Sequence, residues 1–205
     1  MQTYELINLL NECYINKSKL DRPFVVAIDG LSGAGKTTLV KRIQEQLTNI
    51  DVVVIHIDDH IVERNKRYHT GYEEWYEYYS LQWDVEKLSN DLFEKLQSNS
   101  DIHLPFYNNS TDTYEVKEIP FTPRSIVLVE GIFLQRHEWR DYLDFVIYID
   151  CPRDIRYKRV LTRDTYIGDF ESRLNKYKNR YWLGEDHYLK VVKPMEIADL
   201  IINFE

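Results

Sequence analysis

Eight consecutive residues have the types and spacing of a phosphate-binding loop. Residues 30–37 read Gly-Leu-Ser-Gly-Ala-Gly-Lys-Thr and match the pattern G-x-x-x-x-G-K-[ST], after an apolar run and before a helical pattern. Glycines let successive N–H groups point at phosphate oxygens, and the N-terminus of the following helix adds partial positive charge. We expect Lys36 to bind the outer phosphates of a nucleotide and Thr37 to bind Mg²⁺. The other predicted nucleotide contacts are Gly30, Ser32, Gly33, Ala34, Gly35 and Thr38.

Acidic residues end three β-branched runs. Asp29 precedes the loop, Asp58 follows a Val-rich run, and Glu130 ends a third run. Ligands bind at the carboxyl ends of the strands in an open parallel sheet, so Asp58 and Glu130 are predicted to face a γ-phosphate and its metal ion. Asp59 and His60 come next in the chain, and for these two a loop or capping role is favoured over a functional one.

Arg156, Arg159 and Arg163 are spaced three and four positions apart and therefore share one face of a predicted helix. A solvated stripe of charge is one explanation. The other is a mobile lid whose guanidinium groups neutralise a transferring phosphoryl group. Arg159 and Arg163 are the candidate catalytic residues under the second explanation, and Arg156 is the weaker candidate.

Trp83 and Asp84 form a pair with two interpretations. Trp83 offers a surface on which a flat group can stack, and the carboxylate of Asp84 can accept hydrogen bonds from two adjacent sugar hydroxyls. Alternatively, Trp83 belongs to the core and Asp84 caps the helix that follows it. The Tyr-rich stretch 72–79 is more simply explained by packing than by recognition.

The elements that must position these residues alternate between strands and helices, which predicts an α/β fold with a doubly wound, parallel, five-stranded sheet. The nearly continuous apolar runs predict strands buried on both faces at Phe24–Asp29, Asp51–Asp58, Ser125–Glu130, Asp144–Asp150 and Ala198–Asn203. Helical patterns cover Gly35–Leu47, Val85–Leu96, Pro152–Asp164 and Glu171–Val192. An extra N-terminal helix is expected over residues 1–20. Residues 60–83 and 97–123 read as irregular insertions, and the whole span 60–123 is the expected acceptor-binding region.

Length and composition restrict the class of protein. A chain of 205 residues fits one domain, with a small lid expected over about residues 153–180. The net charge of −8 provides no general basic field for nucleic acid or an anionic membrane, and no apolar run reaches the length of a membrane span. Cys13 and Cys151 are far apart, without metal-ligand spacing, and are expected to be unpaired. The first residues lack a signal-peptide pattern, so a cytoplasmic location is expected.

Together, these residues resemble the uridine kinase and nicotinamide riboside kinase branch of the P-loop kinases, with phosphoribulokinase and pantothenate kinase as more distant relatives. The resemblance covers most of the chain, from Phe24 to Asn203. It rests on IDGLSGAGKTT (Ile28–Thr38), IDDH (Ile57–His60), LQWDVEKL (Leu81–Leu88), LPFY (Leu104–Tyr107), VLVEGIF (Val127–Phe133), RVLTRD (Arg159–Asp164) and KPMEIADLII (Lys193–Ile202).

The resemblance implies a role for each matching residue. It makes Asp58 the catalytic aspartate, Glu130 an acidic residue near Mg²⁺, and Arg159 and Arg163 lid arginines. Trp83 and Asp84 match a pair that stacks on the acceptor and binds its ribose, and Tyr107 matches a tyrosine that contacts the base. The sequence departs from uridine kinases at residues 108–113, which contain no histidine to recognise a pyrimidine, and at residues 165–171, where the lid is short.

The resemblance implies a kinase that uses ATP and Mg²⁺ to phosphorylate a hydroxyl of a nucleoside or a similar ribose-bearing small molecule. Two alternatives stay open: a kinase of a non-nucleoside alcohol, such as a pantothenate-like or sugar-like compound, and an ATP-binding regulator that phosphorylates nothing. A GTP switch is disfavoured because Asn175-Lys176 is followed by Tyr177-Lys178 and does not complete the guanine-reading motif Asn-Lys-x-Asp. The oligomeric state is left open.

Overall fold

A parallel five-stranded sheet forms the centre of the structure, a computed structural model that describes residues 3–17 and 20–203. Its strands are β1 (Phe24–Asp29), β2 (Val52–His56), β5 (Ile126–Glu130), β6 (Phe145–Asp150) and β7 (Leu200–Asn203). They lie in the order β2-β5-β1-β6-β7, and each neighbouring pair is parallel. The predicted α/β class and the five predicted strands are confirmed.

The sheet is buried on both faces because successive side chains of a strand point to opposite sides. Val26 and Ile28 of β1 face a core layer formed with helices α1 (Thr3–Lys17) and α2 (Lys36–Gln46). Val25 and Ala27 face the opposite layer, which includes Trp139 and the helices after β2. The expected N-terminal helix is present as α1, and positions 1–2 and 18–19 of the expected span lie outside the described residues.

A separate two-stranded antiparallel sheet replaces the irregular structure expected over residues 97–123. It consists of β3 (Ile102–Asn108) and β4 (Thr113–Ile119), joined by a short turn. Ile102 and Leu104 on β3 are buried in the larger core layer, whereas β4 is exposed along nearly its whole length. The prediction was wrong here because β4 alternates weakly and carries charged residues, so it lacks the apolar run that revealed the central strands.

Short helices fill the remaining segments. They are α3 (Arg64–Arg67), α4 (Glu74–Ser80), α5 (Val85–Leu88), α6 (Glu94–Ser98), α7 (His137–Arg140), α8 (Arg153–Arg163), α9 (Phe170–Lys176), α10 (Trp182–Val191) and α11 (Pro194–Ile197). A π-helical turn, Ser89–Phe93, joins α5 to α6, and a second, Tyr177–Tyr181, joins α9 to α10. The helical patterns predicted over Val85–Leu96 and Glu171–Val192 are therefore each present, with a π turn in the middle.

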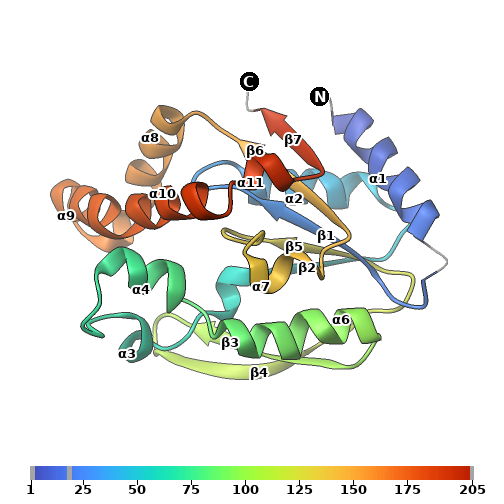
Figure 1. The fold of residues 1–205 in the computed structure, drawn as a ribbon, viewed down its shortest axis with the longest axis horizontal. Coiled ribbons are helices and arrows are strands. Elements are labelled where there is room, and N and C mark those ends of the chain that lie inside the picture. Colours follow the sequence, from blue (N-terminus) through green and yellow to red (C-terminus); the bar gives the residue numbers. More distant parts are fainter. Residues whose placement is uncertain (1–2, 18–19, 204–205) are drawn as a thin grey trace.

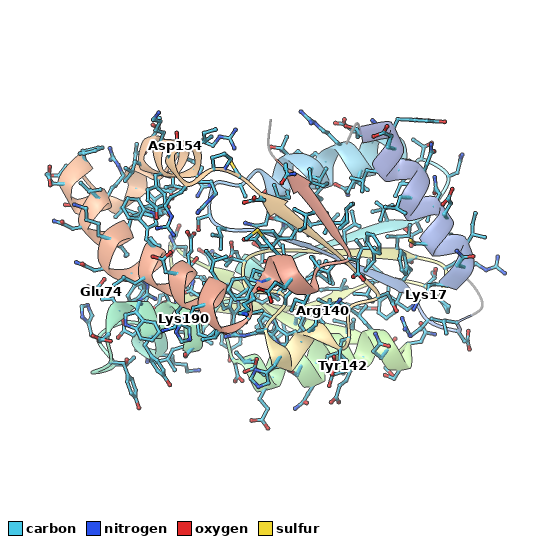
Figure 2. All side chains as sticks on the ribbon, turned by 45° about the horizontal axis from the view of Figure 1, so that its top comes forward. Lys17, Glu74, Arg140, Tyr142, Asp154 and Lys190 are labelled. Carbon is cyan, nitrogen blue, oxygen red and sulfur yellow. The ribbon has the colours of Figure 1, made fainter. Side chains whose placement is uncertain are left out.

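Two groups of helices lie at one end of the molecule. Figure 1 shows α8, α9 and α10 above α3 and α4 at the left, while α1 lies at the right. Figure 2 shows Asp154 of α8 and Glu74 of α4 at this same end and Lys17 of α1 at the opposite end. In the described part of the chain, no helix is both long enough and apolar enough to span a bilayer.

Candidate functional site

The phosphate loop, residues 30–37, turns sharply between β1 and α2. Gly33 and Gly35 have φ values of 78° and 103°, which are accessible to glycine and strained for other residues. A Cβ atom on Gly33 would lie 3.0 Å from the carbonyl oxygen of Arg156, so the loop also packs closely against α8. Lys36 Nζ donates to the carbonyl oxygens of Gly30 at 2.8 Å and Leu31 at 3.3 Å. This arrangement places the ammonium group over the loop.

Asp29 anchors the base of the loop from the end of β1. Its carboxylate accepts hydrogen bonds from Gly30 N at 2.8 Å, from Gln135 Nε2 at 3.0 Å and from the hydroxyl of Tyr188 at 2.5 Å. Burial raises the pKa of Asp29, and these three hydrogen bonds oppose the rise. Because Asp29 is fully buried, its role is to hold the loop rather than to contact a ligand.

Thr37, Glu130 and His56 meet beside the loop. Thr37 Oγ1 lies 3.3 Å from both carboxylate oxygens of Glu130, and His56 Nδ1 lies 2.6 Å from Glu130 Oε2. The hydrogen bond to Glu130 raises the pKa of His56. Burial alone would raise the pKa of Glu130, but the bond to His56 and the charge of Lys36 outweigh it and lower the pKa. Glu130 is therefore ionised over the neutral range.

These oxygen atoms fit Mg²⁺, which prefers hydroxyl, carboxylate, water and phosphate ligands. Within residues 3–17 and 20–203, no three His, Cys, Asp or Glu side chains form a group that could hold a metal ion. The oxygens of Thr37 and Glu130 suit Mg²⁺ bound by one or two protein oxygens together with substrate phosphates. The structure brings together Thr37 and Glu130, two of the three predicted metal ligands, and Asp58 lies close enough for the charge of Glu130 to raise its pKa.

Asp58 lies just beyond β2, in the 3-10 turn Ile57–His60. Asp58 is exposed to the cavity beside the loop, and neighbouring protein displaces part of the water around its carboxylate. The resulting loss of water raises the pKa of Asp58, while the nearby charge of Lys36 opposes the rise. A carboxylate with a raised pKa is a better proton acceptor than an ordinary aspartate.

Two cavities meet at Asp58. The phosphate cavity, about 1010 Å³, is lined by the loop and by Glu130, Arg159 and Arg163. The second cavity, about 720 Å³, extends from Asp58 toward Arg64, Arg67, Tyr68, Gln82, Lys176 and Tyr181. Ser32, Tyr78 and Arg163 also line both cavities. A group in one cavity can therefore react with a group in the other at Asp58.

The predicted lid arginines lie on α8 and line the phosphate cavity. Arg159 Nη1 donates to the carbonyl oxygen of Gly33 at 3.0 Å. Arg163 makes two hydrogen bonds to Asp164, at 2.6 and 3.1 Å, and Asp164 also accepts a hydrogen bond from the hydroxyl of Tyr177. Arg163 remains 64% exposed at its side chain, so it has room to move toward a bound phosphate.

Arg156 has a structural role. Its guanidinium group is buried and pairs with Glu185 at 2.9 Å, and it also donates to the carbonyl oxygens of Cys151 and Ser32. Sequence reasoning missed Glu185, which lies on α10, far along the chain from the loop that it supports.

The structure corrects the expectation that Trp83 stacks on an acceptor. Trp83 is only 2% exposed, packs edge-to-face against Phe133 and Trp139, and donates from Nε1 to the carbonyl oxygen of Ile57 at 2.9 Å. Its ring faces are therefore covered by the core. The alternative interpretation of Trp83 as a core residue describes this arrangement.

Asp84 and Tyr107 also lie outside the walls of both cavities. Asp84 is the N-cap of α5 and accepts a hydrogen bond from Lys87 N at 3.0 Å, as its alternative interpretation had it. Tyr107 donates to Asp112 at 2.8 Å and accepts from Arg67 Nη2 at 3.2 Å. Each side chain is engaged with protein groups, and the expected contacts of Asp84 with sugar hydroxyls and of Tyr107 with a base stay predictions.

The second cavity is lined largely by residues that the sequence analysis did not single out. Arg64 and Arg67 come from α3, whereas Lys176 and Tyr181 come from the end of α9 and the π turn after it. Residue types and spacing gave no signal for this grouping because the two segments are far apart in the sequence. Residues 60–123, the expected acceptor-binding region, contribute Arg64, Arg67 and Gln82 to the wall of this cavity, and acceptor binding there stays a prediction.

Comparison with known proteins places this geometry in a family. Residues 25–204 match the model of the Phosphoribulokinase / Uridine kinase family. The chain belongs to this family. The chain is similar to a uridine kinase of Staphylococcus epidermidis, 30% identical over 191 residues, a match that covers 89% of this chain and 88% of that protein. A uridine kinase of Borrelia garinii is 33% identical over 187 residues, covering 87% and 85% of the two chains.

The solved structures agree with the family assignment. A possible uridine kinase from Bacillus stearothermophilus is 41% identical, with a TM-score of 0.76, and the match covers 94% of this chain and 98% of that chain. Family membership supports a phosphotransferase with a P-loop nucleotide site. The fold is therefore that of a P-loop kinase of the phosphoribulokinase/uridine kinase family.

Proposed function

We propose that the protein transfers the γ-phosphoryl group of ATP to a hydroxyl group of a small molecule. The observation that carries the proposal is the position of Asp58, where the phosphate cavity and the second cavity meet. ATP would place its phosphates on the loop, and the acceptor would enter the second cavity with its hydroxyl beside Asp58.

Different residues would have different roles in this reaction. The hydroxyl oxygen of the acceptor bonds to the γ-phosphorus as the bond from that phosphorus to the β,γ-bridging oxygen breaks, and the hydroxyl proton passes to Asp58. Lys36, Arg159 and Arg163 stabilise the charge on the phosphoryl oxygens. Thr37, Glu130 and Asp58 would hold Mg²⁺, which supplies further charge neutralisation when bound. Most of the catalysis is positioning and electrostatic stabilisation.

The names of the relatives support a nucleoside or another ribose-bearing compound as the acceptor. A second class, non-nucleoside alcohols, is favoured by the wall of the second cavity. Asp84, the carboxylate expected to bind a ribose diol, lies elsewhere. The two carboxylates that line this cavity are Asp58 and Asp164, and Asp164 is already bonded to Arg163 and Tyr177.

An acceptor screen tests the proposal. The full chain is incubated with Mg²⁺, ATP labelled at the γ-phosphate, and nucleosides, sugars and other alcohols in separate reactions. We expect label to reach an acceptor with the wild type and not with Lys36→Ala. Lys41→Ala, at an exposed site on α2, is the matched control and should retain activity. Nucleotide binding with no labelled acceptor would contradict the proposal and favour an ATP-binding regulator.

A further inference from the structure

The part of the second cavity beyond Asp58 is lined by three cationic side chains. Arg64, Arg67 and Lys176 all contribute to this wall, and none of them lines the phosphate cavity. Across residues 3–17 and 20–203, none of these three side chains forms an ion pair with a carboxylate. This is unexpected for a chain with a net charge of −8, in which carboxylates outnumber basic residues.

Neutral groups of the protein fix the positions of these cations. Arg67 is 3% exposed, donates from Nε to the carbonyl oxygen of Val62 at 2.8 Å, and lies over the ring of Tyr107, 5.2 Å from its centroid. Arg64 donates from Nη2 to the carbonyl oxygen of Asn109. Lys176 Nζ lies 4.7 Å from the centroid of Tyr68. None of these contacts is an ion pair, although the charges of Arg64 and Arg67 help to lower the pKa of Asp112.

Nearby carboxylates are committed to other groups. Asp112 accepts from the backbone N–H of Arg64 and from the hydroxyl of Tyr107, not from a guanidinium group. Glu77 pairs with the buried Arg180 at 3.0 Å. Asp164, which also lines the cavity, is bonded to Arg163 and Tyr177.

Tyr68 also lines the cavity, and the pKa of its hydroxyl reflects the positive electrostatic potential of the nearby cations. Burial would raise the pKa of its hydroxyl, but the charges of Arg180, Lys176 and Arg67 outweigh burial and lower the pKa. An environment that favours a phenolate favours other anions in the same place.

We propose that the acceptor carries an anionic group, a phosphate or a carboxylate, which binds Arg64, Arg67 and Lys176 while its hydroxyl lies beside Asp58. This inference rests on the proposed function and narrows its substrate class. An uncharged acceptor would bring Arg64 and Lys176 out of water without giving them a partner and would leave the already buried Arg67 without one, whereas an anion would form charge-assisted hydrogen bonds with these cations. The anion would also fix which hydroxyl of the acceptor faces the phosphate cavity.

Matched ligands test the proposal by direct binding. The full chain is saturated with Mg²⁺ and a non-hydrolysable ATP analogue, and calorimetry then measures the binding of ribose, ribonate, ribose 5-phosphate, glycerol, glycerate, glycerol 3-phosphate and uridine. We expect at least one charged compound to bind about tenfold or more tightly than its uncharged counterpart, with an advantage that falls as salt is added. Comparison of ribonate with ribose 5-phosphate, and of glycerate with glycerol 3-phosphate, distinguishes carboxylate from phosphate.

Two variants localise the effect. Lys176→Gln and Arg64→Gln should each reduce the advantage of the charged ligand by about tenfold and leave the affinity for the ATP analogue unchanged. Lys178→Gln is the control because Lys178 is exposed, close to Lys176 in the chain, and lines neither cavity. Equal affinity for charged and uncharged compounds, or an advantage that survives both variants, would overturn the proposal.

Turnover separates this inference from the proposed function. The same compounds are assayed with labelled ATP. Phosphorylation of uridine or another uncharged alcohol with no gain from an added charge would overturn the inference and leave the kinase assignment standing. Failure of every compound to accept label, despite tight binding of the ATP analogue, would count against phosphoryl transfer itself.

Discussion

Glu185 on α10 accepts a hydrogen bond from the backbone N–H of Ser32 at 2.9 Å, across 153 positions of sequence. The second carboxylate oxygen of Glu185 pairs with Arg156, which in turn donates to the carbonyl oxygen of Ser32 at 3.2 Å. One buried ion pair thus binds both backbone groups of a residue in the phosphate loop. The shape of the loop therefore depends on α8 and α10 as well as on its own glycines.

Replacing Glu185 should destabilise the protein strongly. In Glu185→Ala the buried Arg156 loses its partner, which typically costs about 3–5 kcal/mol. The matched control is Asp186→Ala, because Asp186 and Arg153 form an exposed pair, with side chains 44% and 52% exposed, and such a pair contributes about 1 kcal/mol or less. Urea unfolding measures both variants. Similar losses in the two would show that the Glu185–Arg156 pair does not support the loop.

Replacing Asp58 should affect chemistry more than binding. Asp58→Asn keeps the shape of the side chain and removes its charge and most of its basicity, so kcat should fall by about a hundredfold or more, with little change in nucleotide affinity. Asp59→Asn, at an exposed neighbour that lines neither cavity, should keep nearly full activity. Steady-state kinetics and nucleotide titration separate the two effects. A wild-type kcat in Asp58→Asn would rule out the catalytic role.

The two lid arginines should be needed for turnover. Arg159→Ala and Arg163→Ala should each lower kcat/KM far more than the small change expected for a solvated surface charge. Arg153→Ala is the control on the same helix, since Arg153 lines neither the phosphate cavity nor the second cavity. If the three variants all stay within about twofold of wild type, the interpretation as a solvated stripe is correct.

The His56–Glu130 pair should make stability depend on pH in a defined direction. The pKa of His56 is raised above 6.5, so its contribution is complete below pH 6.5 and is lost as the pH rises through the raised value. The pKa of Glu130 is lowered below 4.5, so its contribution is complete above pH 4.5 and is lost as the pH falls through the lowered value. The pair therefore stabilises the fold most between these two pH values.

Unfolding curves of wild type and His56→Gln, recorded with EDTA at several pH values, measure this contribution. The difference in free energy of unfolding should be largest between pH 4.5 and 6.5 and should shrink at higher pH. His137→Gln is a suitable comparison because His137 is 90% exposed at its side chain, and it should show little difference throughout. A difference that grows as the pH rises would contradict the assigned direction.

The central strands and the phosphate loop could be predicted because their signals are local. The loop motif fixes each residue type over a short span, and strands buried on both faces give apolar runs that do not depend on distant residues. Asp58 and Glu130 were identifiable for the same reason, since strand ends in a parallel sheet converge.

The residues around the second cavity could not be predicted because their grouping is tertiary. The residues around Asp84 are compatible with two roles, capping the following helix or binding a diol. The sequence does not distinguish these roles, because they depend on the orientation of α5. The cations of the cavity wall come from α3 and from the end of α9, and no periodicity links these segments. The contacts of Phe133 and Trp139 with the ring of Trp83 could not be predicted either, because both residues are far from Trp83 in the sequence.

The strand order of the central sheet has a consequence for biosynthesis. β1, which leads into the phosphate loop, lies between β5 and β6, and both of these neighbours come from the second half of the chain. A ribosome therefore delivers the loop well before either flanking strand exists, and contacts so distant in sequence form slowly. A fragment that stops before Ser125 would contain every residue of the motif and leave β1 without a neighbour on either side. The segment that is easiest to recognise in the sequence thus follows a strand whose pairing on both sides has to wait until residues 126–150 have been synthesised.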